Sequence, residues 1–301
     1  MKYKAIAILG PTATGKTEIA STIAQKIDSE IINLDSVQIY KMLDIGSAKP
    51  REKVIIKHHL IDIFEPNEKV DMKKVIDMAT DIGLEVANRG KIPIFCGGTG
   101  LYFKALFYGV FDGPSRNEEI RQKLKKIKEE KGVKFLFEEL KNIDPETAEK
   151  ISENDYIRIE RALEVYYTTG QKISKLQKSY KHDPQFEFIK IGLILERKEL
   201  YRRIEERIND MIEDGLIEEV KNVLKIYPES QVINSAIGYK EVKDFLENKI
   251  DRDTMIYLIK RNTRRFAKRQ ITLFKPIRDI NWFSPYEKEK IIDFVIEKIK
   301  N

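Results

Sequence analysis

The chain has 301 residues, of which 42% are hydrophobic and 35% charged, and its formal net charge is +6. A chain of this length can bury a core without cross-links, and its one cysteine and three histidines exclude a disulfide framework and a Cys/His zinc cluster. The longest stretch without a charged residue, Ile92–Phe103, has 12 residues, against the roughly 20 that span a bilayer. We therefore expect a cytoplasmic protein with no membrane association.

Short apolar runs alternate with helical patterns over the N-terminal third. The pattern predicts helices over Thr17–Ile27 and 68–89, and strands over Ala5–Leu9, Glu30–Leu34 and Ile92–Cys96. Strands separated by helices indicate a parallel, helix-covered sheet, in which ligands bind beyond the carboxyl ends of the strands. A distinctive segment follows each expected strand: Gly10–Thr17, Asp35–Tyr40 and Gly97–Tyr102. We expect these three segments to form one site.

The strand pattern stops after Gly113-Pro114, and residues 117–180 are typical of a run of short helices, in which Asn154 is expected to cap a helix over Asp155–Thr168. A strand over Phe186–Leu195 then returns to the sheet. Beyond it the pattern predicts helices over 198–226, 239–248 and 251–275, an edge strand over Ile280–Phe283, and a capping box at Ser284–Glu287 that opens a last helix.

A complete phosphate-loop motif lies between the first expected strand and the first expected helix. It comprises Gly10, Pro11, Thr12, Ala13, Thr14, Gly15, Lys16 and Thr17. Backbone N–H groups of such a turn converge on an anion, the helix N-terminus adds its dipole, and the lysine reaches the phosphate oxygens. The Thr17 hydroxyl is the expected ligand for Mg²⁺. An ordinary glycine-rich turn is the alternative, and the complete motif in this context makes phosphate binding the favoured interpretation.

The predicted fold class follows from this motif. We expect an α/β protein with a P-loop NTPase-like parallel sheet, helices on both of its faces, and a helical insertion domain. The expected domains are a core made of residues 1–113 and 185–301 with a helical C-terminal part, and an insertion at residues 114–184.

The motif alone does not say which phosphate compound binds. ATP is the obvious ligand, and a kinase would use an acid at a strand end, such as Asp35, to hold the metal. Two features favour another use. Asp35 opens a polar segment, Asp35–Tyr40, whose donors and acceptors suit the edge of a nucleobase, and the third strand ends in Gly97-Gly98-Thr99-Gly100 without an acid.

The combination of motifs resembles the tRNA dimethylallyltransferases, also called isopentenyl-tRNA transferases. The matching segments cover about residues 5–275 in order: Gly10–Thr17, Asp35–Tyr40, Asp44–Pro50, His58–Asp62, Gly97–Tyr102, Arg158–Leu163, Ala236–Glu241 and Ala267–Thr272. Two positions depart from the family pattern: Leu273 stands where the family usually has tryptophan, and Val37 where it often has arginine.

The resemblance implies transfer of a dimethylallyl group from dimethylallyl diphosphate to N6 of adenosine 37 in tRNA, with Mg²⁺ as the cofactor. A loop that holds a diphosphate also serves a diphosphate leaving group, whose developing charge must be stabilised. Lys16, Thr17-bound Mg²⁺ and Arg207 would take that role, Arg207 because it matches the arginine that ends the family's Leu-x-x-Arg-Ile-x-x-Arg pattern at Leu200–Arg207. Asp35 would accept a proton from the attacking amino group.

The resemblance also implies that a monomer binds the anticodon stem-loop, with the insertion domain contacting the tRNA. We assign the tRNA contacts to residues of the motifs and of the basic segment described next: Asp35, Ser36, Val37, Gln38, Thr99, Arg121, Arg158, Arg161, Gly238, Tyr239, Lys240, Arg264, Arg265 and Lys268. Arg158 and Arg161 are one turn apart, so an exposed surface pair is the alternative for them.

Residues 260–278 carry eight basic side chains and no acidic one. Arg261, Arg264, Arg265 and Lys268 follow an i, i+3, i+4, i+7 spacing, which places them on one helical face. A solvated face is the ordinary explanation for charged residues, but an unbalanced stripe favours contact with phosphates. Two alternatives to a tRNA prenyltransferase stay open on these residues alone: an ATP-dependent small-molecule kinase, and a noncatalytic RNA-binding module.

Overall fold

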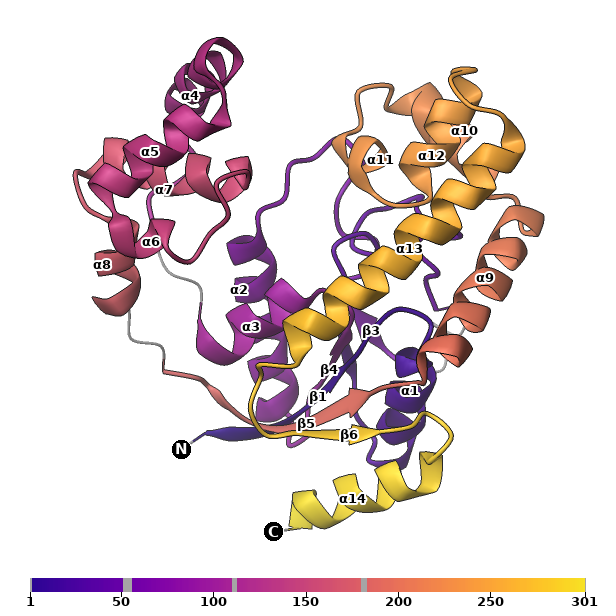
Figure 1. The fold of residues 1–301 in the computed structure, drawn as a ribbon. Coiled ribbons are helices and arrows are strands. Elements are labelled where there is room, and N and C mark those ends of the chain that lie inside the picture. Colours follow the sequence, from indigo (N-terminus) through magenta and orange to yellow (C-terminus); the bar gives the residue numbers. More distant parts are fainter. Residues whose placement is uncertain (1, 51–55, 110–112, 180–182, 301) are drawn as a thin grey trace. The chain divides into compact units, whose positions relative to one another are not determined.

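The computed structural model describes residues 2–50, 56–109, 113–179 and 183–300 (Figure 1). The chain divides into two compact units, one made of Met1–Tyr108 with Pro184–Asn301 and the other of Gly109–Asp183. We call the first the sheet unit and the second the helical unit, and describe each by itself. Within the described residues, no helix combines the length and the apolar character that crossing a membrane requires.

A parallel sheet of six strands forms the centre of the sheet unit within the described residues. Its strands lie in the order β3-β2-β4-β1-β5-β6. Their bounds are β1 Tyr3–Leu9, β2 Ile31–Leu34, β3 His58–His59, β4 Ile94–Gly97, β5 Phe186–Leu193 and β6 Ile280–Phe283. Strand β1 pairs with β4 and β5, with Ile6 beside Ile94 and Ile189. The order places the carboxyl end of β1, where the phosphate loop begins, between those of β4 and β5.

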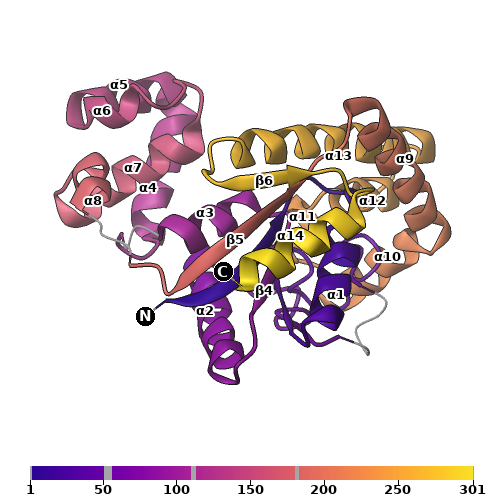
Figure 2. The ribbon, with the colours of Figure 1, turned by 90° about the horizontal axis from the view of Figure 1, so that it is seen from below.

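Helices cover both faces of the sheet, which confirms the predicted α/β class (Figures 1 and 2). Alternate residues of β1, including Ile6 and Ile8, face α1 (Lys16–Lys26) and α14 (Lys288–Lys300). On the other face, α2 (Met72–Asn88) and α3 (Gly100–Tyr108) pack through an aromatic cluster. In it the Phe107 and Phe188 ring centroids are 4.9 Å apart.

Local capping corrects two expected boundaries. Helix α2 begins at Met72 instead of 68, because the Asp71 side chain accepts a hydrogen bond from Lys74 N at 2.8 Å. Helix α7 (Tyr156–Thr169) is capped by Asp155, whose Oδ1 accepts from Arg158 N at 3.3 Å, so the expected Asn154 cap is wrong by one residue. Strand β3 has two residues and was not expected; its His59 contacts Glu30 Oε2 at 2.7 Å.

Five helices between β5 and β6 form the C-terminal part of the sheet unit. They are α9 (Arg197–Glu213), α10 (Leu216–Ile226), α11 (Gln231–Ser235), α12 (Tyr239–Leu246) and α13 (Arg252–Phe274). The expected continuous helix over 198–226 is wrong, because Gly215 adopts φ 101° and separates α9 from α10. Helix α13 contacts α3, where Phe274 and Phe103 lie 6.0 Å apart between ring centroids.

The helical unit has a core of its own. Its helices are α4 (Glu118–Lys131), α5 (Val133–Ile143), α6 (Pro145–Ala148), α7 and α8 (Ile173–Ser179). Their apolar faces enclose a buried cluster that includes Leu124, Leu136, Ile159 and Leu163. The expected run of helices extends to residue 180, which lies outside the described residues together with 181 and 182.

Candidate active site

The phosphate loop forms a tight turn between β1 and α1. At Gly10 an added Cβ would lie 2.5 Å from Leu193 O, and Gly15 has φ 79°, so both positions require glycine. Thr14 Oγ1 donates to Pro11 O at 2.8 Å, which closes the turn. Lys16 Nζ donates to the same carbonyl at 2.6 Å. The loop therefore holds its shape and keeps its lysine folded back over it.

Helix α13 fastens the phosphate loop to the neighbouring strand through one buried side chain. Gln270 Oε1 accepts from Thr12 N at 2.8 Å, and its Nε2 donates to Gly98 O at 2.8 Å. An added Cβ at Gly98 would lie 2.6 Å from that nitrogen, so the glycine leaves room for the amide. The sequence does not predict this link between the phosphate loop and Gly98. The one sign of it is that Gln270 lies inside the family-like segment Ala267–Thr272.

Two cations and one carboxylate share the electrostatic environment of the loop. Arg207 Nη1 of α9 donates to Thr12 Oγ1 at 3.1 Å. The pKa of Lys16 is lowered to about 8, chiefly by burial and also by the positive charge of Arg207, while the Asp35 carboxylate opposes the shift. Burial also lowers the pKa of Arg207, and the Asp35 carboxylate opposes this shift too. The structure thus brings Lys16, Arg207 and Asp35 together, three residues that are far apart in the sequence.

Asp35 lies directly after β2, where its side chain organises the next turn. Its Oδ1 accepts from Val37 N at 2.9 Å and from Gln38 N at 3.3 Å. Among the described residues, no side chain or backbone group hydrogen bonds to its Oδ2. One oxygen therefore holds the turn while the other is available to a ligand.

Two neighbours of Asp35 join the ends of β2 and β4. Ser36 N donates to Thr99 Oγ1 at 3.2 Å, and Thr99 N donates to Leu34 O at 3.3 Å. Ser36 is exposed, and Asp35, Val37 and Thr99 are half-buried. The expected meeting of the three segments that follow β1, β2 and β4 is confirmed by these contacts and by those of Gln270.

A cavity of about 940 Å³ opens beside the phosphate loop. Ala13 and Gly15 of the loop form one side of it, residues of the segment 44–50 a second, and residues of α9 from Arg203 to Met211, with Asp214 just beyond the helix, a third. Arg207 lies in the wall that faces the loop. The cavity can therefore admit a ligand whose anionic end reaches Arg207 beside the loop.

Thr17 stands exposed in the first turn of α1. Its hydroxyl makes no hydrogen bond within the described part of the chain, and no three His, Cys, Asp or Glu side chains gather there as metal ligands. A divalent cation at Thr17 would then take most of its oxygen ligands from a bound phosphate and from water, which suits Mg²⁺.

Two of the residues expected to contact tRNA are buried, and this corrects their assignment. The Tyr239 side chain is fully buried, and its hydroxyl donates to Glu219 Oε1 at 2.8 Å. Gly238 is the N-cap of α12, and its N–H donates to Glu241 Oε2 at 2.7 Å. Both residues support the packing of α12. Lys240 is exposed, and its contact with tRNA stays a prediction.

The basic stripe of α13 is partly balanced by a neighbouring helix. Arg264 Nη1 contacts Glu205 Oε1 of α9 at 2.7 Å. The prediction that the stripe has no balancing acid is therefore wrong at Arg264. Arg265 and Lys268 are exposed and form no ion pair with any described residue. These two are the exposed side chains of the stripe and the most available to phosphates, whereas Arg261 is half-buried and donates to Asn262 Oδ1 at 3.3 Å.

Arg121 and Arg161 converge on a buried carboxylate inside the helical unit. Arg121 Nε and Arg161 Nη1 contact the two oxygens of Glu164 at 2.8 Å and 2.7 Å. Burial would raise the pKa of Glu164, but hydrogen bonds from the two arginines and from Asn117 N lower it to about 2. The cluster stabilises the unit, and contact of either arginine with tRNA stays a prediction. Arg158 is more exposed, 3.4 Å from Asp155 Oδ2, and stays one too.

Comparison with known proteins identifies relatives over nearly the whole chain. The family model described as IPP transferase matches residues 38–276, and the model described as isopentenyl transferase matches residues 3–63. The tRNA dimethylallyltransferase of Halothermothrix orenii is 45% identical over 93% of this chain and 87% of its own length. That of Fervidobacterium nodosum is 44% identical over 98% of this chain and 96% of its own length.

Solved structures show the same architecture. The full-length tRNA isopentenylpyrophosphate transferase of Bacillus halodurans matches with a TM-score of 0.74 at 36% identity, covering 99% of this chain and 97% of its own. A eukaryotic dimethylallyltransferase, whose structures are described as snapshots of the enzyme acting on tRNA, matches with a TM-score of 0.83 at 28% identity. That match covers all of this chain and 80% of the eukaryotic one.

Proposed function

The chain belongs to the IPP transferase family, and we propose that it transfers the dimethylallyl group of dimethylallyl diphosphate to N6 of adenosine 37 in tRNA. One observation supports this proposal above the others. A complete phosphate loop, with Lys16 and Arg207 at hand, adjoins an Asp35 that has one carboxylate oxygen free of described partners. The proposed partner is the anticodon stem-loop, bound by a monomer in the cytoplasm.

The phosphate loop and its two cations serve the leaving group in this proposal. As the bond between C1 of the prenyl group and the diphosphate oxygen breaks, negative charge grows on the diphosphate. Lys16 and Arg207 are positioned at the loop to stabilise that charge, and both are held in a partly buried environment where electrostatic interactions are stronger than in water. The backbone N–H groups at the start of α1 add to this effect.

Asp35 serves the acceptor in this proposal. The adenine leaves the stack of the anticodon loop, because a base within the stack cannot reach the half-buried Asp35. Its N6 forms the new bond to C1 of the prenyl group, and the proton that N6 loses passes to Asp35 Oδ2. Oδ1 keeps its hydrogen bonds from Val37 N and Gln38 N, so the turn stays in place during the transfer.

Mg²⁺ is the proposed cofactor, and the residues present fit it. Thr17 would supply one hydroxyl ligand, and the diphosphate and water would supply the others, since Mg²⁺ usually keeps several waters and binds through substrate phosphates. When bound, the ion would neutralise part of the charge of the diphosphate.

The experiment that tests the function uses unmodified tRNA with dimethylallyl diphosphate labelled in its prenyl group, beside a reaction with ATP. We expect label in the RNA and no net turnover of ATP. The kinase alternative has no support among the relatives reported above. ATP turnover without prenyl transfer would revive it, and tight RNA binding with neither activity would favour a noncatalytic module.

The free part of the α13 stripe predicts a change in the salt dependence of tRNA binding. Replacing Arg265 and Lys268 together by alanine removes two exposed cations, and each lost phosphate contact lowers the log–log slope of affinity against salt by about one unit. We therefore expect weaker binding and a slope lower by about two. The matched control replaces Lys26 and Lys298, two exposed cations on the face of the sheet covered by α1 and α14. Equal slopes in the two double variants would contradict the assignment.

The lowered pKa of Lys16 predicts how activity depends on pH. The charged lysine binds the diphosphate, and its pKa of about 8 means that it loses its charge as the pH rises through that value. We therefore expect kcat/KM for dimethylallyl diphosphate to fall above pH 8, by at most about tenfold per pH unit. The Lys16→Arg variant, which stays charged, should lack this descent. A wild-type profile that stays flat well above pH 8 would contradict the prediction.

A further inference from the structure

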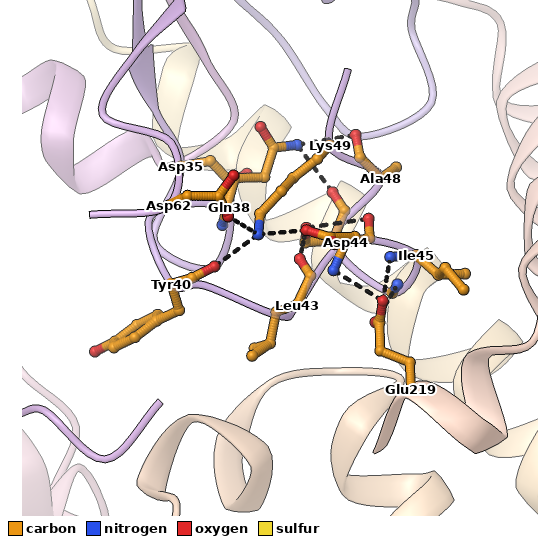
Figure 3. A network of polar contacts seen from close by, with 12 residues as sticks. Asp35, Gln38, Tyr40, Leu43, Asp44, Ile45, Ala48, Lys49, Asp62 and Glu219 are labelled. Carbon is orange, nitrogen blue, oxygen red and sulfur yellow. Dashed lines mark hydrogen bonds and ion pairs between the residues drawn. The ribbon is translucent and has the colours of Figure 1, made fainter. Parts of the chain in front are cut away.

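One segment connects the acceptor side of the site with the cavity beside the phosphate loop. We call residues 44–50 the wall loop, because Asp44, Ile45 and Ala48 line that cavity. The same loop holds the side chain of Gln38, whose Nε2 donates to Ser47 O at 2.9 Å and to Ala48 O at 3.1 Å (Figure 3). Gln38 follows Asp35 by three residues, so the position of the wall loop bears on the turn that carries Asp35.

A buried lysine braces the wall loop from within. The Lys49 side chain is 2% exposed, and its Nζ donates to Tyr40 O at 2.7 Å. The same nitrogen contacts Asp44 Oδ1 at 2.7 Å and Asp62 Oδ1 at 2.5 Å (Figure 3). This buried cation joins Asp44 to the other end of the loop, and moving the two apart would remove one of the two carboxylates that balance its charge.

Glu219 holds the loop from outside. Its Oε2 accepts from Asp44 N at 2.9 Å and from Ile45 N at 2.7 Å, and its Oε1 accepts from Gly46 N at 3.1 Å (Figure 3). Three consecutive backbone N–H groups thus converge on one carboxylate, an arrangement that suits an anion. The glutamate belongs to α10, about 175 residues further along the chain, so it anchors the wall loop to the C-terminal helices.

The fit around Gly46 shows how closely the loop is seated. An added Cβ at Gly46 would lie 2.6 Å from the Tyr239 ring and 2.8 Å from Leu216. The hydroxyl of the same tyrosine donates to Glu219 Oε1 at 2.8 Å. Tyr239 therefore orients the carboxylate and also forms the surface on which the loop rests.

We propose that Glu219 is a positioning residue for the transfer reaction: it seats the wall loop, which holds the Gln38 side chain and thereby the turn that carries Asp35. This inference rests on the proposed function. The contacts that hold the phosphate loop, from Gln270 to Thr12 N, from Lys16 to Pro11 O and from Arg207 to Thr12 Oγ1, do not involve the wall loop. The wall loop also lines the cavity beside the phosphate loop, but because it makes none of these contacts, we expect Glu219 to affect the transfer step more than the binding of inorganic diphosphate.

The first test is the Glu219→Gln variant, which puts an amide N–H₂ where one carboxylate oxygen accepts backbone N–H groups. A displacement of about 1 Å at a reacting group costs on the order of 100-fold in rate, so we expect kcat to fall by roughly that factor. The affinity for inorganic diphosphate should stay within about twofold of wild type. The matched control is Glu218→Gln, which removes the same charge one residue away, from an exposed pair with Lys221.

The second variant, Gly46→Ala, moves the same loop by steric contact without changing any charge. It should reproduce the separation between kcat and diphosphate affinity. If Glu219→Gln behaves like Glu218→Gln, the inference is wrong. If Glu219→Gln and Gly46→Ala both lose diphosphate affinity in step with kcat, Glu219 serves the general stability of the fold and the inference is equally wrong.

Amide hydrogen exchange separates this inference from the proposed function. Exchange over residues 44–46 should accelerate in Glu219→Gln and stay at the wild-type rate in Glu218→Gln, whether or not any prenyl transfer occurs. A wild-type chain that transfers no prenyl group would refute the proposed function, while protection of 44–46 would still show whether Glu219 seats the loop. If exchange over residues 44–46 is unchanged in Glu219→Gln, the inference is wrong, even when the wild-type protein transfers prenyl groups at full rate.

Discussion

Replacing Asp35 by asparagine is expected to lower kcat by about 10³-fold while tRNA and diphosphate still bind, since a general base contributes about 10²–10⁴-fold. Asparagine keeps an oxygen that can accept from Val37 N and Gln38 N, so the turn is retained. It removes the negative oxygen that takes the proton from N6. Single-turnover transfer of labelled prenyl groups to tRNA, beside a binding assay with the same RNA, measures the two effects separately.

Asp35→Ala is the companion variant for this prediction. It removes the base and also both hydrogen bonds that hold the turn, so it should weaken tRNA binding in addition to kcat. Turnover near the wild-type rate in Asp35→Asn would contradict the role of Asp35 as a base. Loss of RNA binding in Asp35→Asn as large as in Asp35→Ala would show that Asp35 acts through the shape of the turn.

The second large effect is expected at Lys16. The Lys16→Met variant removes a charged hydrogen-bond donor that lies folded over the phosphate loop, and we expect kcat/KM for dimethylallyl diphosphate to fall by about 10³-fold. The affinity for inorganic diphosphate should weaken as well, because the lysine binds the leaving group before and after the transfer. Steady-state kinetics and titration with diphosphate measure the two quantities.

The control for this variant is Lys26→Met, which removes an exposed lysine from the other end of α1. Its kinetics should match those of the wild type. If Lys16→Met kept the wild-type affinity for diphosphate and lost only kcat, the lysine would act on the adenine acceptor. The assignment of Lys16 to the diphosphate would then be wrong.

Patterns contained in one short segment predict most of the sheet unit. The strands β1, β2, β4, β5 and β6 are each visible as a short apolar or alternating pattern, and the phosphate loop is a contiguous motif, so all six features can be found locally. Strand β3 is missed because it has only two residues, His58 and His59, and both are polar. The break at Gly215 is missed because apolar periodicity continues on both sides of it.

Contacts between distant segments explain the errors at the site. Arg264 looks unbalanced in its own helix because its partner, Glu205, belongs to α9. Tyr239 lies in a family-like motif, yet its hydroxyl belongs to a structural contact with Glu219. Gln270 and Glu219 each connect segments more than 170 residues apart. A helical pattern identifies a residue's element, but which element packs against it depends on the complete fold.

The distribution of charge was more informative than the net charge of +6. The structure assigns Lys16 and Arg207 to the surroundings of the phosphate loop, and Arg121 and Arg161 to a buried carboxylate. Of the basic stripe on α13, Arg265 and Lys268 are left exposed. The salt dependence of binding counts how many such cations contact a polyanion.

A crystal structure of the protein with inorganic diphosphate, Mg²⁺ and an anticodon stem-loop would show the roles of Lys16, Arg207 and Asp35 together. We predict diphosphate in the phosphate loop against Lys16 and Arg207, and the N6 of an extruded adenine within hydrogen-bond distance of Asp35 Oδ2. A structure in which Asp35 instead binds the metal ion, with the adenine still stacked in its loop, would refute the role of Asp35 as the base.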